Sequence, residues 1–143
     1  MQINRSGSAK WSGGLKDGRG SISTQSKALD DHPYGFAMRF EGVAGTNPEE
    51  LIGAAHAACF TMALSKILGE AGLTADAMET KAVVTLEEKD GGFAITASKL
   101  TLKATIPGAQ QAQFQELAAL AKANCPVSKL LNAQIDLEAE LLG

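Results

Sequence analysis

The chain has 143 residues, of which 45% are hydrophobic and 20% charged, and its formal net charge is −3. This length suits one domain that buries about two thirds of its unfolded surface, and the mild negative charge excludes a nucleic-acid partner, which would select a basic surface. Residues 1–10 lack the apolar core of a signal peptide. We therefore expect a single cytoplasmic domain over residues 1–143, with no membrane partner.

The N-terminal third of the chain predicts β-structure. Residues 5–11 and 20–26 are short β-compatible segments separated by a glycine-rich stretch, which is typical of a hairpin. Residues 36–41 alternate Phe, Met and Phe with Ala, Arg and Glu, and this period of two predicts a third strand after a loop at residues 30–35. Arg39 would then lie on the face opposite the aromatic side chains.

A long helix is predicted over residues 48–70. Asn47 is a suitable N-cap, Pro48 suits the first helical position, and Glu49 is favoured at the positive end of the helix dipole. At the other end, Gly72 can adopt the left-handed conformation that terminates helices. We expect this helix to be the centre of the fold.

The middle of this helix has almost no polar face. Residues 51–64 are apolar or small, apart from His56, Cys59 and Thr61. The apolar run is too short and too interrupted for a membrane span, so these residues predict a buried core helix. The alanines and glycine at positions 53–58 would allow a neighbouring backbone to approach closely.

The second half of the chain predicts a hairpin followed by two helices and a strand. Residues 79–88 and 93–106 are strands joined by a turn at 90–92, and the apolar positions change parity near Ser98–Lys99, which predicts a β-bulge there.

Three further elements complete the chain: an amphipathic helix at residues 109–123, a short helix from Pro126 to Leu131 and a closing strand at 134–140. Strands grouped around a central helix predict an α+β fold.

The two cysteines have different predicted surroundings. Cys59 lies in the middle of a buried helix, where desolvation alone would raise its pKa, so a reactive thiolate there needs a nearby cation. Cys125 precedes the start of a short helix, whose unpaired N–H groups would lower its pKa. Free cysteines are also common as small buried hydrophobes, and that reading stays open for Cys59, as a structural role does for Cys125.

The same residues are compatible with other chemistry. His56 is compatible with a hydrogen-bonded core histidine or with a base for Cys59, one turn away, although no acid that would orient such a base is evident. Cys59, Cys125, His56 and His32 nominally supply four zinc ligands, but they lack the spacing of a zinc site. We therefore expect no metal.

Three segments resemble the OsmC/Ohr family: YGFAMRFEG at 34–42, NPEELIGAAHAACF at 47–60 and NCPVSKLL at 124–131. The similarity extends over essentially the whole chain. It implies the OsmC-like fold, with antiparallel sheets packed around a long buried helix, and an intertwined homodimer whose active sites lie at the subunit interface.

The resemblance also implies a two-cysteine peroxidase that reduces organic hydroperoxides without metal or other cofactor. Cys59 would be oxidised to a sulfenic acid, and Cys125 would condense with it to a Cys59–Cys125 disulfide. Arg39 matches the arginine that holds the thiolate charged and polarises the peroxide, and Glu49 matches the glutamate that orients this arginine. An external dithiol, such as a lipoylated protein or another small thiol donor, would regenerate the enzyme.

Glu49 precedes Cys59 by ten residues, or about 15 Å along a straight helix, so it acts on the thiol only through Arg39 or if the helix is broken near Gly53. The rival hypothesis is a non-enzymatic redox sensor or apolar-ligand-binding protein that uses the same buried site.

Overall fold

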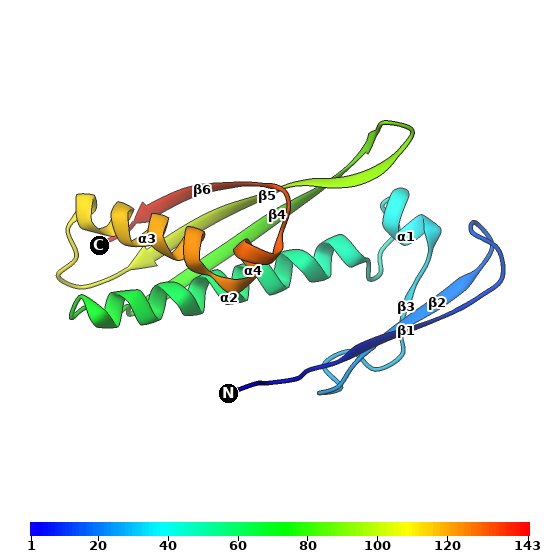
Figure 1. Cartoon of the computed structure of the whole chain (residues 1–143), viewed down its shortest axis with the longest axis horizontal. Helices are drawn as coiled ribbons and strands as arrows, with labels where there is room; N and C mark the ends of the chain where they lie inside the picture. Colours follow the sequence, from blue (N-terminus) through cyan, green and yellow to red (C-terminus); the bar gives the residue numbers. More distant parts are fainter. The chain divides into compact units, whose positions relative to one another are not determined.

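The computed structural model describes all residues 1–143, and the chain forms two compact units, Met1–Pro48 and Glu49–Gly143. We refer to them as the N-terminal unit and the C-terminal unit. Each contains its own three-stranded sheet (Figure 1). The single domain over residues 1–143 stays a prediction.

The sheet of the N-terminal unit is an antiparallel meander of β1 (Gly7–Ser12), β2 (Arg19–Thr24) and β3 (His32–Tyr34). The predicted hairpin of the first two strands is confirmed. Trp11 on β1 packs against Tyr34 on β3, with the ring centroids 5.5 Å apart, so an aromatic pair ties the two outer strands together.

The prediction of a strand at residues 36–41 is wrong, because Phe36–Phe40 form the short helix α1. The third strand, β3, instead uses residues expected to be loop. In a run this short, positions i and i+4 share a face in a helix as well as in a strand. Phe36 and Phe40 use that helical relation, with ring centroids 4.9 Å apart, and the N–H of Glu41 donates to the carbonyl of Ala37.

The predicted central helix is confirmed as α2 (Pro48–Glu70), and it is unbroken over its whole length. Gly72 follows with a φ of +75°, in the left-handed region that glycine adopts without steric cost. The N–H of Leu73 then donates to the carbonyl of Leu68 at 2.8 Å, which satisfies a carbonyl at the end of the helix.

The sheet of the C-terminal unit has the strand order β4 (Ala77–Lys89), β5 (Gly92–Thr105) and β6 (Gln134–Leu141). The first pair is the predicted antiparallel hairpin, with a two-residue turn in which Asp90 and Gly91 both have positive φ. The last strand pairs with β5 in the parallel direction.

A β-bulge interrupts the hairpin two residues before the predicted position. Thr85 pairs with Ala97 and Leu86 with Ile95, so Thr96 is the extra residue of β5. The prediction placed the bulge too late in β5 because a serine in a strand ordinarily faces solvent, and Ser98 was therefore assigned to the exposed face. It is buried instead, on the same face as Leu100.

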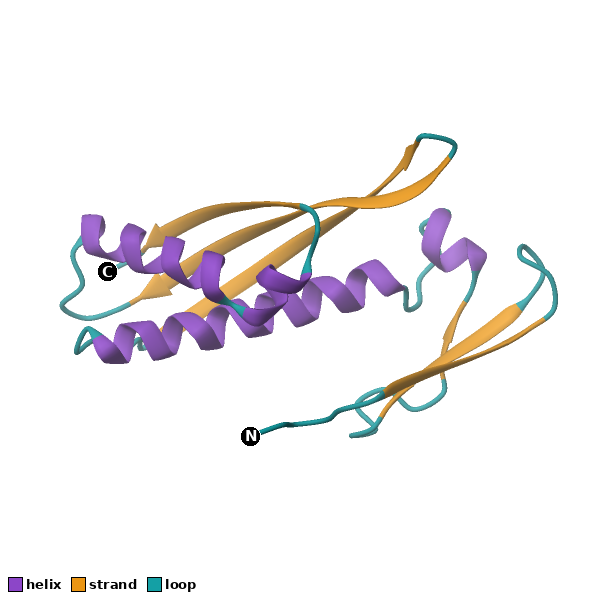
Figure 2. Cartoon of the chain, viewed as in Figure 1, coloured by secondary structure: helices purple, strands orange, loops and turns teal.

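The predicted helices after the hairpin are confirmed as α3 (Gln111–Asn124) and α4 (Pro126–Leu130). Figures 1 and 2 show α2 and α3 running side by side over one face of the sheet. Along β6, residues on the helix side are half-buried and the alternate residues are exposed. The core of this α+β unit lies between the helices and the sheet, and its largest buried apolar residues are Phe60, Leu64, Leu68, Leu100, Leu102, Ile106 and Phe114.

Helix α2 packs on the sheet through one face. Gly53 lies so close to β4 that a Cβ atom there would be 2.9 Å from the carbonyl oxygen of Ala82, as its small residues predicted. The opposite face, with Ala54, Ala58 and Met62, is exposed in the single chain, so burial on all sides is not observed.

Length and composition alone make α2 able to cross a membrane, contrary to the expectation from its apolar run. Its packing on β4 and its part in the core identify it as the core helix of a folded unit, and a core helix passes the same test of length and composition.

Candidate active site

The fold brings Cys59 and Cys125 together. Cys59 lies in the middle of α2, and Cys125 is the residue that joins α3 to α4. Both are free thiols, and they interact through a hydrogen bond between the side chains and through charge. Cys125 is fully buried, whereas Cys59 is half-buried.

The C-terminal unit disfavours a thiolate at Cys59. Burial raises the pKa of this thiol, and the thiol donates a hydrogen bond to Cys125, which raises the pKa further. A hydrogen bond from the backbone of Val127 acts in the opposite direction but does not compensate. Cys59 is therefore held as the protonated partner of the pair by its own unit.

At Cys125 the effects that lower the pKa outweigh those that raise it. Burial acts to raise its pKa, but hydrogen bonds from the Cys59 thiol, from the backbone and hydroxyl of Ser128 and from the backbone of Val127 outweigh it, so the pKa is lowered. The two N–H groups belong to the first turn of α4, where helical backbone donors have no partner within the helix. The predicted stabilisation of a Cys125 thiolate thus has a structural basis.

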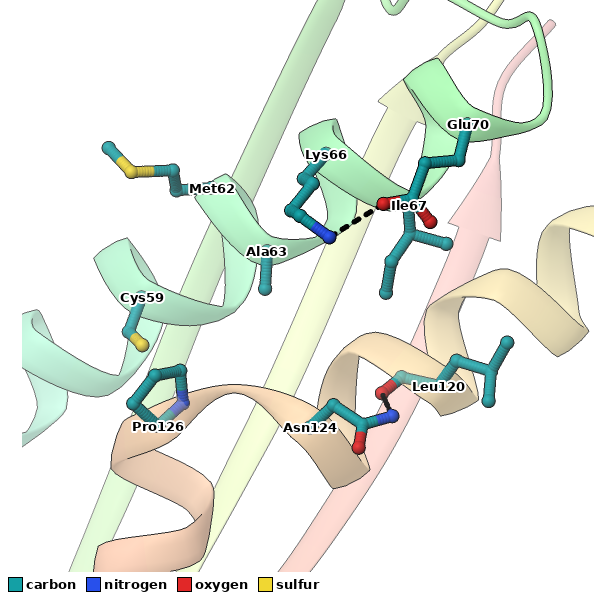
Figure 3. A pocket seen from close by; sticks show the side chains of 9 residues that line it. All are labelled: Cys59, Met62, Ala63, Lys66, Ile67, Glu70, Leu120, Asn124 and Pro126. Carbon is teal, nitrogen blue, oxygen red and sulfur yellow. Dashed lines mark hydrogen bonds and ion pairs between the residues drawn. The ribbon is translucent and has the colours of Figure 1, made fainter.

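A cavity of about 560 Å³ opens beside the Cys59 thiol, between α2 and the α3–α4 segment (Figure 3). Its inner wall is apolar, and Lys66 and Glu70 form an ion pair of 2.6 Å near its far end. The residues that line it are Cys59, Met62, Ala63, Lys66, Ile67, Glu70, Leu120, Asn124 and Pro126. An apolar molecule in this cavity would have one end at the sulfur of Cys59.

His56 is a hydrogen-bonded core histidine. It is fully buried, its Nδ1 lies 2.7 Å from Ser98 Oγ, and its Nε2 lies 2.8 Å from Ser128 Oγ. Burial lowers its pKa, so the neutral ring is favoured. Because both ring nitrogens are engaged by serines, the geometry does not support His56 as a direct base for Cys59.

Ser98 and Ser128 are site residues that the sequence reasoning missed. A buried histidine requires partners for both ring nitrogens, and Ser98 shares the period-two pattern of the buried residues of β5. Ser128 follows Cys125 by three residues. These were the available signals, but neither identifies which serine contacts the histidine.

The other two predicted site residues lie in different units. Arg39 is on α1 of the N-terminal unit, where its guanidinium carbon is 5.4 Å from the centroid of the Phe40 ring. Glu49 is in the first turn of α2. Because α2 is unbroken, Glu49 precedes Cys59 by about 15 Å of helix and does not reach the thiol directly.

No cluster of three or more His, Cys, Asp or Glu side chains in the chain could hold a metal ion. The chemistry that this arrangement supports is that of the two sulfurs. An α+β scaffold with two free cysteines that hydrogen-bond each other, one of which lines an apolar cavity, is typical of the class of thiol-based redox proteins.

Comparison with known proteins assigns the family. A family model described as OsmC-like protein matches residues 41–140. Peroxiredoxin OsmC of Escherichia coli (strain K12) is 52% identical over 141 residues, which cover 99% of each chain. The organic hydroperoxide resistance protein OhrB of Bacillus subtilis (strain 168) is 36% identical over 123 residues, covering 85% of this chain and 88% of the relative.

The fold agrees with that assignment. The crystal structure of Bacillus subtilis OhrB superposes with a TM-score of 0.68 at 30% identity, covering 95% of this chain and 97% of the other. The chain belongs to the OsmC/Ohr family, has the OsmC-like fold and is a peroxidase.

Proposed function

We propose that this peroxidase reduces organic hydroperoxides to alcohols through a Cys59 sulfenic acid and a Cys59–Cys125 disulfide. The observation that supports the proposal is the interaction of two free thiols, one of which lines an apolar cavity. Two sulfurs already in contact can form a bond without a large movement of the backbone.

The proposed reaction is a two-electron transfer from sulfur to peroxide. The Cys59 thiolate attacks the distal oxygen of ROOH, the O–O bond breaks, and the alkoxide takes a proton to leave as an alcohol. The Cys125 thiolate then attacks the sulfur of the Cys59 sulfenic acid, and hydroxide leaves and is protonated to water. The product is a disulfide, and the two electrons lost by the two sulfurs have passed to the peroxide oxygens, which leave in the alcohol and in water.

The cavity favours an organic hydroperoxide over hydrogen peroxide. Its inner wall is formed by aliphatic side chains of α2 and α3, among them Ala63, Ile67 and Leu120. Apolar surface of a substrate that enters this cavity is removed from water, which contributes binding energy that hydrogen peroxide cannot obtain. The Bacillus subtilis relative is also named for resistance to organic hydroperoxides.

Arg39 is proposed as the cation that activates Cys59, and Glu49 as the carboxylate that orients Arg39. The need for a cation follows from the C-terminal unit, which raises the pKa of Cys59. A guanidinium stays protonated and has several N–H donors, so it can hydrogen-bond the thiolate and a peroxide oxygen together. A role for Glu49 through Arg39 is compatible with the unbroken helix.

The disulfide must be reduced from outside. We propose a dithiol reductant, either a lipoylated protein or another small thiol donor, acting on a soluble enzyme in the cytoplasm. A compartment that keeps thiols reduced supplies such donors and suits the two free cysteines.

We also propose a homodimer. The outer face of α2 presents Ala54, Ala58 and Met62, and the side chain of Met62 is 75% exposed in the single chain. A second copy would remove this apolar surface from water. We expect Ala58→Glu to sediment as a monomer, whereas the wild type and Ala112→Glu, which changes an exposed alanine of α3, should sediment as dimers. A monomeric wild type would contradict the proposal.

Steady-state turnover tests the proposed function. The purified protein is mixed with cumene hydroperoxide and dihydrolipoamide, and consumption of the peroxide is followed over time. Many turnovers per subunit, with faster consumption of cumene hydroperoxide than of hydrogen peroxide, are expected. A single stoichiometric oxidation would instead favour the redox sensor or binding protein.

A further inference from the structure

His56 has a structural role that the proposed reaction does not use. Its ring connects three elements, because His56 itself lies on α2, Ser98 on β5 and Ser128 on α4. The ring and Ser98 are almost completely buried, and Ser128 is 8% exposed. Water is therefore excluded from most of this chain of hydrogen bonds, and each donor must be matched with an acceptor inside the protein.

The hydrogens in this chain can be arranged in only a few ways. A neutral imidazole has one N–H donor and one acceptor nitrogen, and each serine hydroxyl has one hydrogen. If Ser98 donates to Nδ1, then Nε2 carries the hydrogen and donates to Ser128 Oγ. The hydroxyl hydrogen of Ser128 is then free of the histidine and is available to another acceptor.

That acceptor is the sulfur of Cys125. Ser128 hydrogen-bonds this sulfur through its side chain as well as through its backbone. The sulfur is fully buried, and no lysine, arginine or carboxylate is among the causes of its pKa shift. The charge of a Cys125 thiolate is therefore stabilised by hydrogen-bond donors rather than by an opposite charge.

We propose that Ser128 is a further catalytic residue, whose hydroxyl donates to the Cys125 thiolate, and that His56, fixed by Ser98, positions that hydroxyl by donating to it from Nε2. The inference rests on the proposed role of Cys125 as the resolving thiol. It deepens that role, because the directed chain from Ser98 to His56 to Ser128 prepares the sulfur that attacks the sulfenic acid.

The first test measures the ionisation of Cys125 in a Cys59→Ser background, where it is the remaining thiol. The ultraviolet absorbance of the thiolate is followed against pH, with the Cys59→Ser/Cys125→Ser protein as the baseline. Ser128→Ala should raise the pKa of Cys125 by about one unit, a tenfold change in ionisation, because one hydrogen bond to a charged group is lost. Ser128→Thr should restore it.

A matched control separates this effect from general loss of a hydroxyl group. Thr80 accepts a hydrogen bond of 2.7 Å from Thr61 in the same unit, and Thr80→Val removes that interaction without changing the Cys125 surroundings. The pKa of Cys125 should be unchanged in this variant. Equal pKa values in Ser128→Ala and its parent would overturn the proposal.

The second test determines the direction of the hydrogen bonds from Ser98 through His56 to Ser128 without altering these residues. His32→Gln leaves His56 as the sole histidine, and nitrogen NMR of its ring identifies the protonated nitrogen. In the reduced protein above the pKa of Cys125, the hydrogen should be on Nε2. A hydrogen on Nδ1 would overturn the proposal, even if the serine variants failed to fold.

Neither test requires peroxide, so the outcomes are separable from the proposed function. If turnover fails but both tests give the expected results, the hydrogen-bond chain stands and the peroxide substrate is wrong. If turnover succeeds and Ser128→Ala leaves the pKa of Cys125 unchanged, the reaction stands and the role of Ser128 is wrong.

Discussion

The two cysteines are in contact, but the protein surrounds them differently. Cys59 projects from the middle of a long helix, where backbone N–H groups are already bonded, and it borders an apolar cavity. Cys125 lies at the junction of two helices, fully buried, and accepts hydrogen bonds from the start of α4. The C-terminal unit thus favours the charge on Cys125 and places Cys59 beside the cavity.

This difference shows what the C-terminal unit lacks for the proposed chemistry. The sulfur beside the cavity is the one that must attack, yet its pKa is raised. The buried sulfur has the lowered pKa, which suits a resolving role because the thiolate is the form that attacks a sulfenic acid. Activation of Cys59 must therefore come from outside this unit, and the proposed source is Arg39.

The largest expected effect is the loss of either sulfur. Cys59→Ser should abolish peroxide consumption because no sulfenic acid can form. Cys125→Ser should permit one turnover and then lose activity as Cys59 is oxidised further to sulfinic acid. Stopped-flow consumption of peroxide, followed by mass spectrometry of Cys59, measures both, and wild-type activity in Cys59→Ser would falsify the mechanism.

Arg39→Ala should have the next largest effect. The pKa of Cys59 should rise further, and kcat/KM for cumene hydroperoxide should fall about a hundredfold, the usual loss when one donor to a developing charge is removed. Alkylation of Cys59 against pH, in a Cys125→Ser background, measures the pKa. Arg19→Ala is the control, because it removes an exposed arginine of the same unit; an equal loss in both variants would contradict the role of Arg39.

A smaller effect is expected from filling the cavity. Ala63→Leu places extra carbon atoms in the wall beside Cys59, so kcat/KM for cumene hydroperoxide should fall about tenfold while that for hydrogen peroxide is unchanged. Ala119→Leu makes the same substitution at an exposed position of α3 and should affect neither substrate. Parallel losses for both peroxides in Ala63→Leu would show that the cavity does not select the substrate.

Much of the fold could be predicted because local signals determine it. Asn47 and Pro48 before the apolar run predicted the start of α2, and Gly72 its end. The pair Asp90–Gly91 predicted the tight turn, since both residues tolerate positive φ. The error at residues 36–41 arose because Phe36 and Phe40, four positions apart, share a face in a helix as well as in a strand.

The site was less predictable because its contacts join residues distant in sequence. The two cysteines were identified, but their contact depends on how α4 packs against α2. Ser98 and Ser128 were missed since a serine in a strand or a short helix is ordinarily exposed, and only the tertiary fold places both against His56. The burial of Ser98 was also unexpected, and for that reason the bulge was predicted at Ser98–Lys99 instead of at Thr96.

The smallest expected effect is a pH dependence of the free energy of unfolding, caused by His56, which hydrogen-bonds Ser128 near Cys125. Burial lowers the pKa of this histidine from 6.5, so the folded state binds fewer protons than the unfolded state at pH values below 6.5. The contribution of neutral His56 to stability is present above pH 6.5 and is lost as the pH falls toward the folded pKa. The loss approaches about 1.4 kcal/mol per pH unit.

Urea unfolding at pH 6.5 and below measures this slope, and a comparison of the two histidines isolates it. His56→Gln should lower stability at neutral pH but remove most of the slope, because no buried imidazole remains to be protonated. His32→Gln should retain the slope, since His32 is exposed. If the slope persists unchanged in His56→Gln, protonation of His56 is not its cause, and neutral His56 does not stabilise the segment around Cys125. The difference between the pKa values of the two thiols would then depend on the α4 backbone donors alone.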